Sequence, residues 1–413
     1  MSVRLRVDSR RLRDDLASLA QIGRSPSGGI HRTAFSAADA QARQWYRDRC
    51  DAAALDLTLD GLGNMFAQQA GTPTDVPAVW TGSHIDTVPD GGPLDGALGT
   101  VAALECVRRL AEAGIELARP VRSVVFADEE GNYSHLFGSY GVAYGYDEAT
   151  LSAMTGRNGD LLTDALADWP WRSGEATQTQ VEPASIHAFV ELHIEQGPHL
   201  EASGTQIGVV TSIVGLGGGR LDFHGRADHA GTTPMHLRRD ALRAAGALLV
   251  ELPRVAASVS PNAVITCGLL HLEPGGANIV PRLASLTLDF RDPERTCLSQ
   301  LAGAIEAAAR QAATEHDVDF TWHPETVIDP VPMDAGVREV IHHAANGCRL
   351  SNITIAAGAG HDSQNMARLA PTGMIFVPSK DGRSHSPAEH TDFEYLEQGA
   401  NTLLATLLQL ATR

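Results

Sequence analysis

The sequence predicts an α/β protein in which a three-layer domain with a mixed sheet is interrupted by an inserted α+β domain. First, a chain of 413 residues is too long for one ordinary hydrophobic core. Second, helix-like and strand-like segments alternate in the N-terminal half, as in sheets covered on both faces. Third, strands after about residue 210 alternate polar and apolar residues, which is typical of a sheet with one covered face. We expect residues 1–210 and 330–413 to form one domain and 211–329 the other.

Capping and turn residues mark the elements of the first domain. A helix over 36–53 begins at Ser36, with Asp39 three residues later, close to a capping box. A turn at 60–63 separates two short strands, 55–59 and 64–68. Hydrophobic patterns predict the remaining elements: strand 76–80, helix 99–113, strand 121–127, buried runs at 352–357 and 373–377, and a closing helix from about residue 393.

The inserted segment has the pattern of an antiparallel sheet covered by two helices. Strand-like alternation occurs at 220–224, 263–272 and 284–291. Helix-like segments occur at 240–252 and, rich in alanine, at 298–315. This pattern predicts a small separate domain.

Composition excludes several kinds of partner. A net charge of −18 argues against binding nucleic acid or an anionic membrane surface. The five cysteines are scattered and form no C-x-x-C pair, which favours a reducing compartment and argues against a thiolate zinc site. The N-terminal residues lack the apolar core of a signal peptide, and no apolar run approaches the length of a membrane span. We therefore expect a cytoplasmic protein.

A glycine-rich loop after the apolar run 76–80 carries the most informative polar residues. It places His84, Asp86 and Asp95 where a buried strand would end. Imidazole and carboxylate together suit a divalent metal ion. Asp86 is too close to His84 to be an easy second ligand, but it could accept the other imidazole N–H and fix the tautomer.

Three further segments carry metal-binding side chains near predicted strand ends. Glu129 and Glu130 follow the strand at 121–127, His193 lies in a short apolar segment, and His385 lies in a C-terminal loop. In open α/β sheets, functional groups collect beyond the carboxyl ends of the strands. The residues fit a two-metal site, with His84 and His193 on one ion, Glu130 and His385 on the other, and Asp95 as the bridge. Glu129 would remain free as a general base.

Each of these residues also has an ordinary interpretation. A single loop histidine is usually only solvated, and an adjacent Glu-Glu pair is usually surface charge. The co-occurrence of all the segments, most of them after strand-like runs and beside glycines, favours the metal site.

The set of segments resembles the amidase/hydantoinase/carbamoylase family of dinuclear metallohydrolases, relatives of aminoacylase and carboxypeptidase G. The resemblance runs from Gly29-Ile-His-Arg-Thr-Ala34 to His385 and rests on His-x-Asp, Glu-Glu-Gly, His-Ile-Glu-Gln-Gly-Pro and His-Ser-Pro in that order. It implies a catalytic first domain and an inserted domain that serves as lid and dimer interface. It also implies two divalent ions per subunit, with zinc favoured and manganese, cobalt or nickel compatible.

The resemblance implies roles for residues beyond the five ligands and the base Glu129. Asp86 matches the carboxylate behind the first histidine. His229 of the inserted domain matches a histidine that reaches the partner subunit's site and stabilises the oxyanion. The positions that match the family's substrate contacts are Gln196, His229, Asn278 and Arg291, with the glycine-rich loop at Gly360 and His361 as a weaker assignment. Three of these residues also have a competing interpretation: a structural role for His229 and His361, and an ordinary surface salt bridge for Arg291.

The implied reaction is hydrolysis of a linear amide or ureido C–N bond in a small substrate that bears a carboxylate. N-carbamoyl-L-amino acids are the favoured class, with allantoate and β-ureidopropionate related to them. The chain departs from the family pattern at two places that bear on the choice of substrate: Asn132-Tyr133-Ser134 follows Glu-Glu-Gly where a small residue and Arg-Phe are usual, and Ser363 ends the Gly-His-Asp loop where Ala is common. The alternatives are an N-acyl-amino-acid deacylase or dipeptidase with the same metals, and a non-catalytic binding protein that retains the fold.

Overall fold

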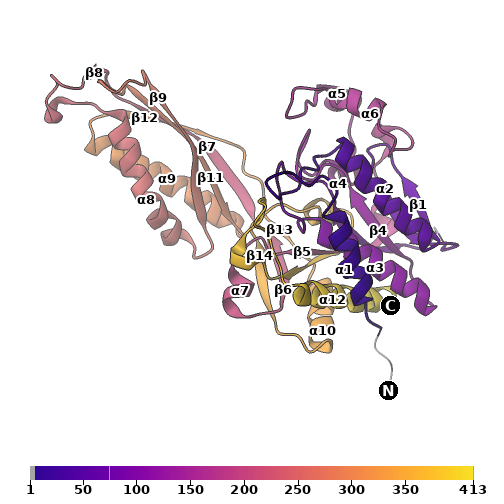
Figure 1. The fold of residues 1–413 in the computed structure, drawn as a ribbon. Coiled ribbons are helices and arrows are strands. Elements are labelled where there is room, and N and C mark those ends of the chain that lie inside the picture. The colour runs from indigo at the N-terminus through magenta and orange to yellow at the C-terminus, as the bar shows by residue number, and fades with distance from the viewer. Residues whose placement is uncertain (1–4, 74, 413) are drawn as a thin grey trace. The chain divides into compact units, whose positions relative to one another are not determined.

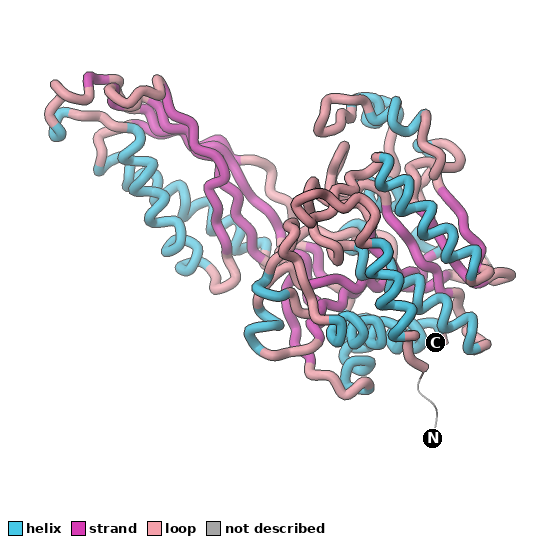
Figure 2. The backbone as a smooth tube through the Cα atoms, in the orientation of Figure 1, coloured by secondary structure: helices cyan, strands magenta, loops and turns pink. Residues whose placement is uncertain are grey.

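The computed structural model of the chain describes residues 5–73 and 75–412, and these residues divide into two compact units. One unit runs to Thr211 and resumes at Pro332, and the other spans Ser212–Val331. Figure 1 shows the elements of both units along the chain, and Figure 2 separates their helices, strands and loops by colour. Among the described residues, no helix combines the length and the apolar character needed to cross a membrane.

The first unit is built on a mixed sheet of nine strands in the described residues. Its central strands are parallel, and antiparallel strands lie toward both edges. The order across the sheet is β1 (Leu55–Leu59), β2 (Met65–Gln69), β4 (Val121–Phe126), β3 (Ala78–His84), β5 (Ile186–Ile194), β15 (Thr372–Val377), β6 (Ile207–Ile213) and β13 (Val331–Pro332), and β14 (Asn352–Ala357) pairs with β6.

Helices cover both faces of this sheet, which gives the three layers predicted from the sequence. One face packs in a hydrophobic core with α1 (Ser9–Leu19), α2 (Ala37–Ala52), α3 (Ala97–Ala113), α10 (Ala335–Gly347) and α12 (Phe393–Ala411). The other face carries an aromatic-rich core under α4 (Phe137–Tyr144) and α11 (Ser363–Met366). Further short helices of this unit are α5 (Glu148–Ala153), α6 (Leu162–Ala167) and α7 (His199–Ser203).

The second unit is an antiparallel four-stranded sheet packed against two helices, as the sequence predicts. The strand order is β12 (Asp319–Pro324), β7 (Gly215–His224), β11 (Leu283–Asp292) and β9 (Val264–Glu273). Helices α8 (Ala241–Val259) and α9 (Arg295–Glu315) pack against each other and against the same sheet. A separate pair of two-residue strands joins β8 (Asp228–His229) to β10 (Ile279–Val280).

Several elements differ from the bounds that the sequence predicts. β3 continues through Thr81 and Ser83 to His84, because both hydroxyl residues are buried in the sheet and Ser83 donates to the carboxylate of Glu191. β7 begins before Arg220, since an added Cβ at Gly217 would lie 2.2 Å from the Phe290 ring and glycine allows that packing. α8 continues past Pro253 to Val259, and the sequence pattern does not predict the helices α1, α4–α7, α10 and α11. Residues 352–357 form a strand but not a buried run, because Ile353 is 38% exposed.

Candidate metal centre

Four adjacent parallel strands bring the predicted ligands to one edge of the large sheet. β3 ends at His84, which pairs with Phe126 near the end of β4. His193 near the end of β5 pairs with Phe376 of β15 in the same direction. The Glu129–Glu130 pair follows β4, and His385 lies in the loop after β15. Parallel pairing therefore places all four segments beyond the carboxyl ends of neighbouring strands.

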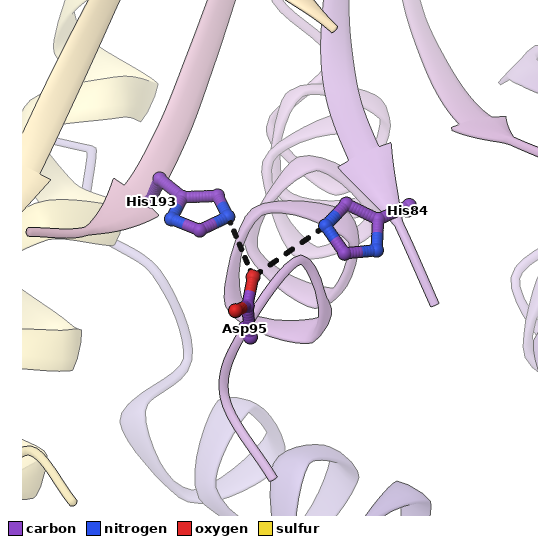
Figure 3. A group of neighbouring side chains, drawn as sticks. All are labelled: His84, Asp95 and His193. Atoms are coloured by element: carbon purple, nitrogen blue, oxygen red, sulfur yellow. Dashed lines mark ion pairs between the residues drawn. The ribbon is translucent and has the colours of Figure 1, made fainter. Parts of the chain in front are cut away.

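Asp95 lies between two groups of these side chains. Its Oδ1 is 3.1 Å from Nε2 of His193 and 3.6 Å from Nε2 of His84, as drawn in Figure 3. Its Oδ2 is 3.2 Å from Nε2 of His385, whose Nε2 is also 3.4 Å from Oε2 of Glu130. Each group, His84–Asp95–His193 and Asp95–Glu130–His385, offers ligand atoms within 4.8 Å of one another. One carboxylate thus faces two separate ligand sets with its two oxygens.

Backbone carbonyls fix the tautomers of two histidines. Nδ1 of His193 lies 2.9 Å from the carbonyl oxygen of Ile194, and Nδ1 of His84 lies 3.0 Å from that of Asp86. Because an Nδ1–H donates in each case, the neutral ring carries its lone pair on Nε2, the nitrogen nearer Asp95 and the one that a metal ion would bind. The carboxylate of Asp86 is farther from His84 Nδ1, at 3.7 Å, so the expected bond to this carboxylate is replaced by one to the Asp86 carbonyl.

Asp86 and Asp128 hold the backbone of the loop that carries the glutamates. The buried carboxylate of Asp86 accepts the N–H groups of Glu129 and Glu130 at 3.3 and 3.1 Å. Asp128 accepts three N–H groups from residues 132–134 at 2.6 to 3.1 Å. Asn132 and its neighbours, which depart from the family pattern, are therefore tied to the same loop as the base candidate Glu129.

The site concentrates carboxylates in a buried setting. Burial raises the pKa of Glu129 well above its ordinary value, against the attraction of His84. Burial and the charge of Asp95 raise the pKa of Glu130 to about 7. Burial also disfavours the charged form of Asp95, but hydrogen bonds from the protonated rings of His193, His385 and His84 outweigh it and lower the Asp95 pKa well below its ordinary value. Such crowding of carboxylates is offset when a cation binds among them.

The residues present fit divalent metal ions. The donors are imidazole nitrogens and carboxylate oxygens, which zinc, manganese, cobalt and nickel all accept. Oε1 of Glu130 is buried and has no hydrogen-bond partner among the described residues, as expected for an atom reserved for a ligand. Glu129 stands beside the donors without joining either group, with Oε2 3.6 Å from His84 Nε2.

His361 lies against the first ligand group. Its ring packs edge-on against His193 at 4.5 Å between centroids, and burial lowers its pKa well below the ordinary value. Glu191 completes a third close group with His193 and His361. The Glu191 carboxylate already accepts from the hydroxyls of Ser83 and Ser363 and from the Ser363 N–H, so it serves the local hydrogen-bond frame. Gly360, next to His361, is half-buried.

Gln196 reaches the bridging carboxylate from the loop after β5. Its Nε2 donates to Asp95 Oδ2 at 2.7 Å and lies 3.2 Å from Ser384 Oγ, while its Oε1 is buried without a partner among the described residues. Glu389 supports the same region with a buried carboxylate. The sequence assigns no role to Ser384 or Glu389. Their only sequence signal is closeness to His385: Ser384 directly precedes it, and Glu389 lies four residues after it.

The second unit separates its three predicted site residues into two places. His229 of β8 pairs with Ile279 of β10, next to Asn278, and both His229 and Asn278 are exposed. β11 begins at Leu283, just after β10. Arg291 lies eight residues farther along β11, which is about 27 Å at the rise of an antiparallel strand. Arg291 forms a salt bridge to Asp289 at 3.1 Å, the competing interpretation offered by the sequence.

The local turn fixes the tautomer of His229. Its Nδ1 lies 3.0 Å from the Gly231 nitrogen and 3.2 Å from the Thr232 nitrogen, so both backbone N–H groups donate to it. Nδ1 must therefore be unprotonated, and the proton of the neutral ring is on Nε2. His229 presents a hydrogen-bond donor, in contrast to His84 and His193, which present acceptors.

The fold and this arrangement agree with comparisons to known proteins. Residues 80–409 match the sequence profile of peptidase family M20/M25/M40. The chain belongs to this family. Among family relatives, an N-carbamoyl-L-amino-acid amidohydrolase of Paenarthrobacter aurescens is 36% identical over 388 residues, covering 92% of this chain and 93% of the relative. The allantoate amidohydrolase of Escherichia coli is 33% identical over 405 residues, covering 97% of each.

A solved structure extends the similarity to the whole fold. The amidase of the hydantoinase/carbamoylase family from Burkholderia multivorans superposes with a TM-score of 0.92 at 33% identity, covering 99% of each chain. The resemblance inferred from the sequence is thereby confirmed, and so is the fold class of this family M20/M25/M40 member.

Proposed function

We propose that this chain is a metal-dependent amidohydrolase that cleaves a ureido C–N bond in a small carboxylate-bearing substrate. N-carbamoyl-L-amino acids are the favoured class, and allantoate and β-ureidopropionate are close alternatives. The observation that carries the proposal is Asp95, whose two oxygens face His84 and His193 on one side and His385 and Glu130 on the other. The names of the relatives support ureido substrates in particular.

Asp95 and the four side chains around it would hold two divalent ions. His84 and His193 would bind one ion, Glu130 and His385 the other, with Asp95 shared between them. Two ions in such a site polarise a carbonyl and make water more acidic. Zinc is the favoured metal, with manganese, cobalt and nickel accepted by the same donors.

Glu129 is the general base of the proposed reaction. It is buried, lies 3.6 Å from His84 Nε2, and belongs to neither ligand group. Its carboxylate would take a proton from the attacking water and pass it to the leaving nitrogen. With a ureido substrate, one water is consumed and the products are ammonia, carbon dioxide and the amine.

The remaining predicted residues would bind the substrate. Arg291 offers a planar fork for a carboxylate, with Asn278 and Gln196 as further polar contacts and Gly360 and His361 lining the pocket. His229 would donate its Nε2–H to the developing oxyanion. Asp86 would keep the Glu129–Glu130 backbone in place through the bonds described above.

We also propose a homodimer formed through the second unit. The edge strand β9 exposes Val264, Leu269 and Leu270, with relative exposures of 53%, 69% and 44%. An unpaired edge with apolar side chains favours pairing with a second chain. The separation of Arg291 from His229 and Asn278 supports the same conclusion, because one small substrate can meet all three only if two subunits contribute.

A cytoplasmic location fits the thiol chemistry of the chain. Among the cysteines of the described residues, Cys50, Cys106, Cys267 and Cys297 are free thiols. Free thiols persist in reducing compartments.

The test is a substrate panel assayed with each of the four metals. N-carbamoyl-L-amino acids, β-ureidopropionate and allantoate are assayed for ammonia, and N-acetyl-amino acids and dipeptides for free amine. The proposal expects ammonia from at least one ureido acid. Activity confined to the N-acetyl or dipeptide set would replace the proposal by a deacylase or dipeptidase, and no bound metal and no turnover would favour a non-catalytic binding protein.

A further inference from the structure

The buried carboxylate of Glu389 holds the backbone of the metal-bridging loop. Glu389 is 5% exposed and lies four residues after His385. Its Oε1 accepts the N–H of Leu94 at 2.7 Å and the N–H of Asp95 at 3.0 Å. These bonds join segments about three hundred positions apart in the chain, so the C-terminal loop sets the position of the Asp95 main chain.

The other oxygen of Glu389 reaches the Asp95 side chain through Ser384. Ser384 Oγ lies 2.8 Å from Glu389 Oε2 and 2.9 Å from Asp95 Oδ2. A hydroxyl has one proton, so it donates to one of these carboxylates at a time and accepts from Gln196 Nε2 at 3.2 Å. Ser384 directly precedes His385, so the same contacts that orient Asp95 also locate the histidine of the second ligand group.

The chain leaves space for this carboxylate. An added Cβ at Gly92 would lie 2.1 Å from Cδ of Glu389 and 2.2 Å from its Oε1. Any larger residue at position 92 would displace the carboxylate from the Leu94 and Asp95 amides. Glycine at this position is therefore part of the same arrangement.

We propose that Glu389 is a positioning residue that holds the bridging carboxylate of Asp95 and the loop of His385 in register with each other. This inference rests on the two-metal site of the proposed function. Glu389 acts through Asp95 and Ser384 and does not bind metal itself. Its loss would leave the Asp95 main chain and the Ser384–His385 segment without their common anchor and let the shared carboxylate shift away from the second ligand group, so the ion at Glu130 and His385 would be held more weakly than the ion at His84 and His193.

The variants Glu389→Leu and Glu389→Gln separate positioning from packing. Leucine fills the space but leaves the Leu94 and Asp95 amides without an acceptor. Glutamine keeps an oxygen for both amides, and its NH₂ donates to Ser384, which directs the Ser384 proton to Asp95. Ser384→Ala removes only the side-chain link and serves where Glu389→Leu fails to fold.

The control is Glu105→Leu, which removes another buried carboxylate of the first unit. Glu105 accepts the Asp8 N–H at 2.8 Å and pairs with Arg11 at 2.6 Å, away from the ligand residues. Its loss tests whether destabilising the unit is enough to weaken metal binding. We expect a lower melting temperature with unchanged metal affinities.

Calorimetric titration of the metal-free protein with manganese and the electron paramagnetic resonance of the loaded protein are the measurements. Wild type and Glu389→Gln are expected to bind two ions with an exchange-coupled spectrum. Glu389→Leu is expected to bind one of them about 10–100-fold more weakly, the range for outer contacts to metal ligands, and to lose the coupling. Ser384→Ala is expected to show a smaller change in the same direction.

Two results would overturn the inference. The first is that Glu389→Leu binds two ions with wild-type affinity and coupling, which would show that Glu389 only packs. Where that variant does not fold, the same result for Ser384→Ala would show this. Fewer than two ions in wild type would remove the inference together with the two-metal site. A wild type that binds two coupled ions but cleaves no ureido acid would contradict the proposed substrate class. The role of Glu389 would then still be decided by metal binding to its variants.

Discussion

The carboxyl edge of the large sheet and the small sheet of the second unit present functional side chains in opposite ways. At the first, His84, His193 and Asp95 are at most 4% exposed, and backbone carbonyls leave the imidazole nitrogens as acceptors. At the second, His229 is exposed and its turn leaves a nitrogen as donor. The first arrangement suits a cation, and the second suits an oxyanion or carboxylate. Variants of the first region should therefore disturb metal binding or proton transfer, and variants of the second should spare the metal.

Removing the metal should have the largest effect and should act on one region only. Chelation is expected to abolish activity and to lower the melting temperature of the first unit, because the crowded carboxylates lose their counter-charge. Adding zinc, manganese or cobalt should restore both. Hydrogen exchange checks the comparison, with faster exchange at residues 84–96 and 128–131 and no change across β7, β9 and β11. Equal changes in both units would contradict the division.

Glu129→Gln should remove turnover and keep the metal. The amide cannot accept the proton, so kcat is expected to fall by about 10²–10⁴-fold, the usual contribution of a general base. Metal analysis should still find two ions per chain, since Glu129 belongs to neither ligand group. Asp86→Asn is the matched comparison, because it weakens the bonds to the Glu129 and Glu130 amides and should lower metal content as well. A Glu129→Gln variant that keeps most of its activity would make the base assignment wrong.

His229→Asn and His229→Gln test the donor in the second unit. Asparagine can accept the Gly231 and Thr232 amides but cannot place a donor where Nε2 lies, and glutamine can place an amide N–H there. We expect kcat to fall by about 10²–10³-fold for asparagine, the cost of losing one oxyanion donor, and less for glutamine. Metal content should not change in either. Imidazole ¹⁵N shifts of the wild type should report a protonated Nε2, and a protonated Nδ1 would contradict the tautomer.

Arg291→Ala should have the smallest of these effects, mainly on KM. Loss of a charged hydrogen bond of about 1.5–3 kcal/mol corresponds to a rise in KM of about 10–100-fold for carboxylate substrates. An uncharged amide analogue of the substrate should be affected little. Asp289→Asn is the control, since it removes the salt bridge to Arg291 without removing the guanidinium. An unchanged KM in Arg291→Ala would leave Arg291 as an ordinary surface charge.

The clustering of the candidate ligands can be predicted from the sequence because strand ends are local features. His84, Glu130 and His193 each follow an apolar run, and parallel pairing then brings them together without further information. The sequence pattern predicts a β3 that ends too early. The last residues of this strand are polar, and their burial depends on distant acceptors such as Glu191.

The supporting contacts could not be predicted because they are long-range and specific. Glu389 is an unremarkable glutamate in the sequence, and its role depends on the Leu94 and Asp95 amides. The carbonyl of Asp86, which fixes the His84 tautomer, carries no sequence signal either. The sequence also does not predict that Arg291 and His229 lie far apart. Strand pairing, not spacing along the chain, decides which end of the sheet each residue occupies.

Anomalous X-ray diffraction at the metal absorption edge tests the central claim most directly. Two peaks per chain are expected, one between His84 and His193 and one between Glu130 and His385, with Asp95 between them. A single peak, or a peak at the Glu191–His193–His361 group in place of the second site, would contradict it.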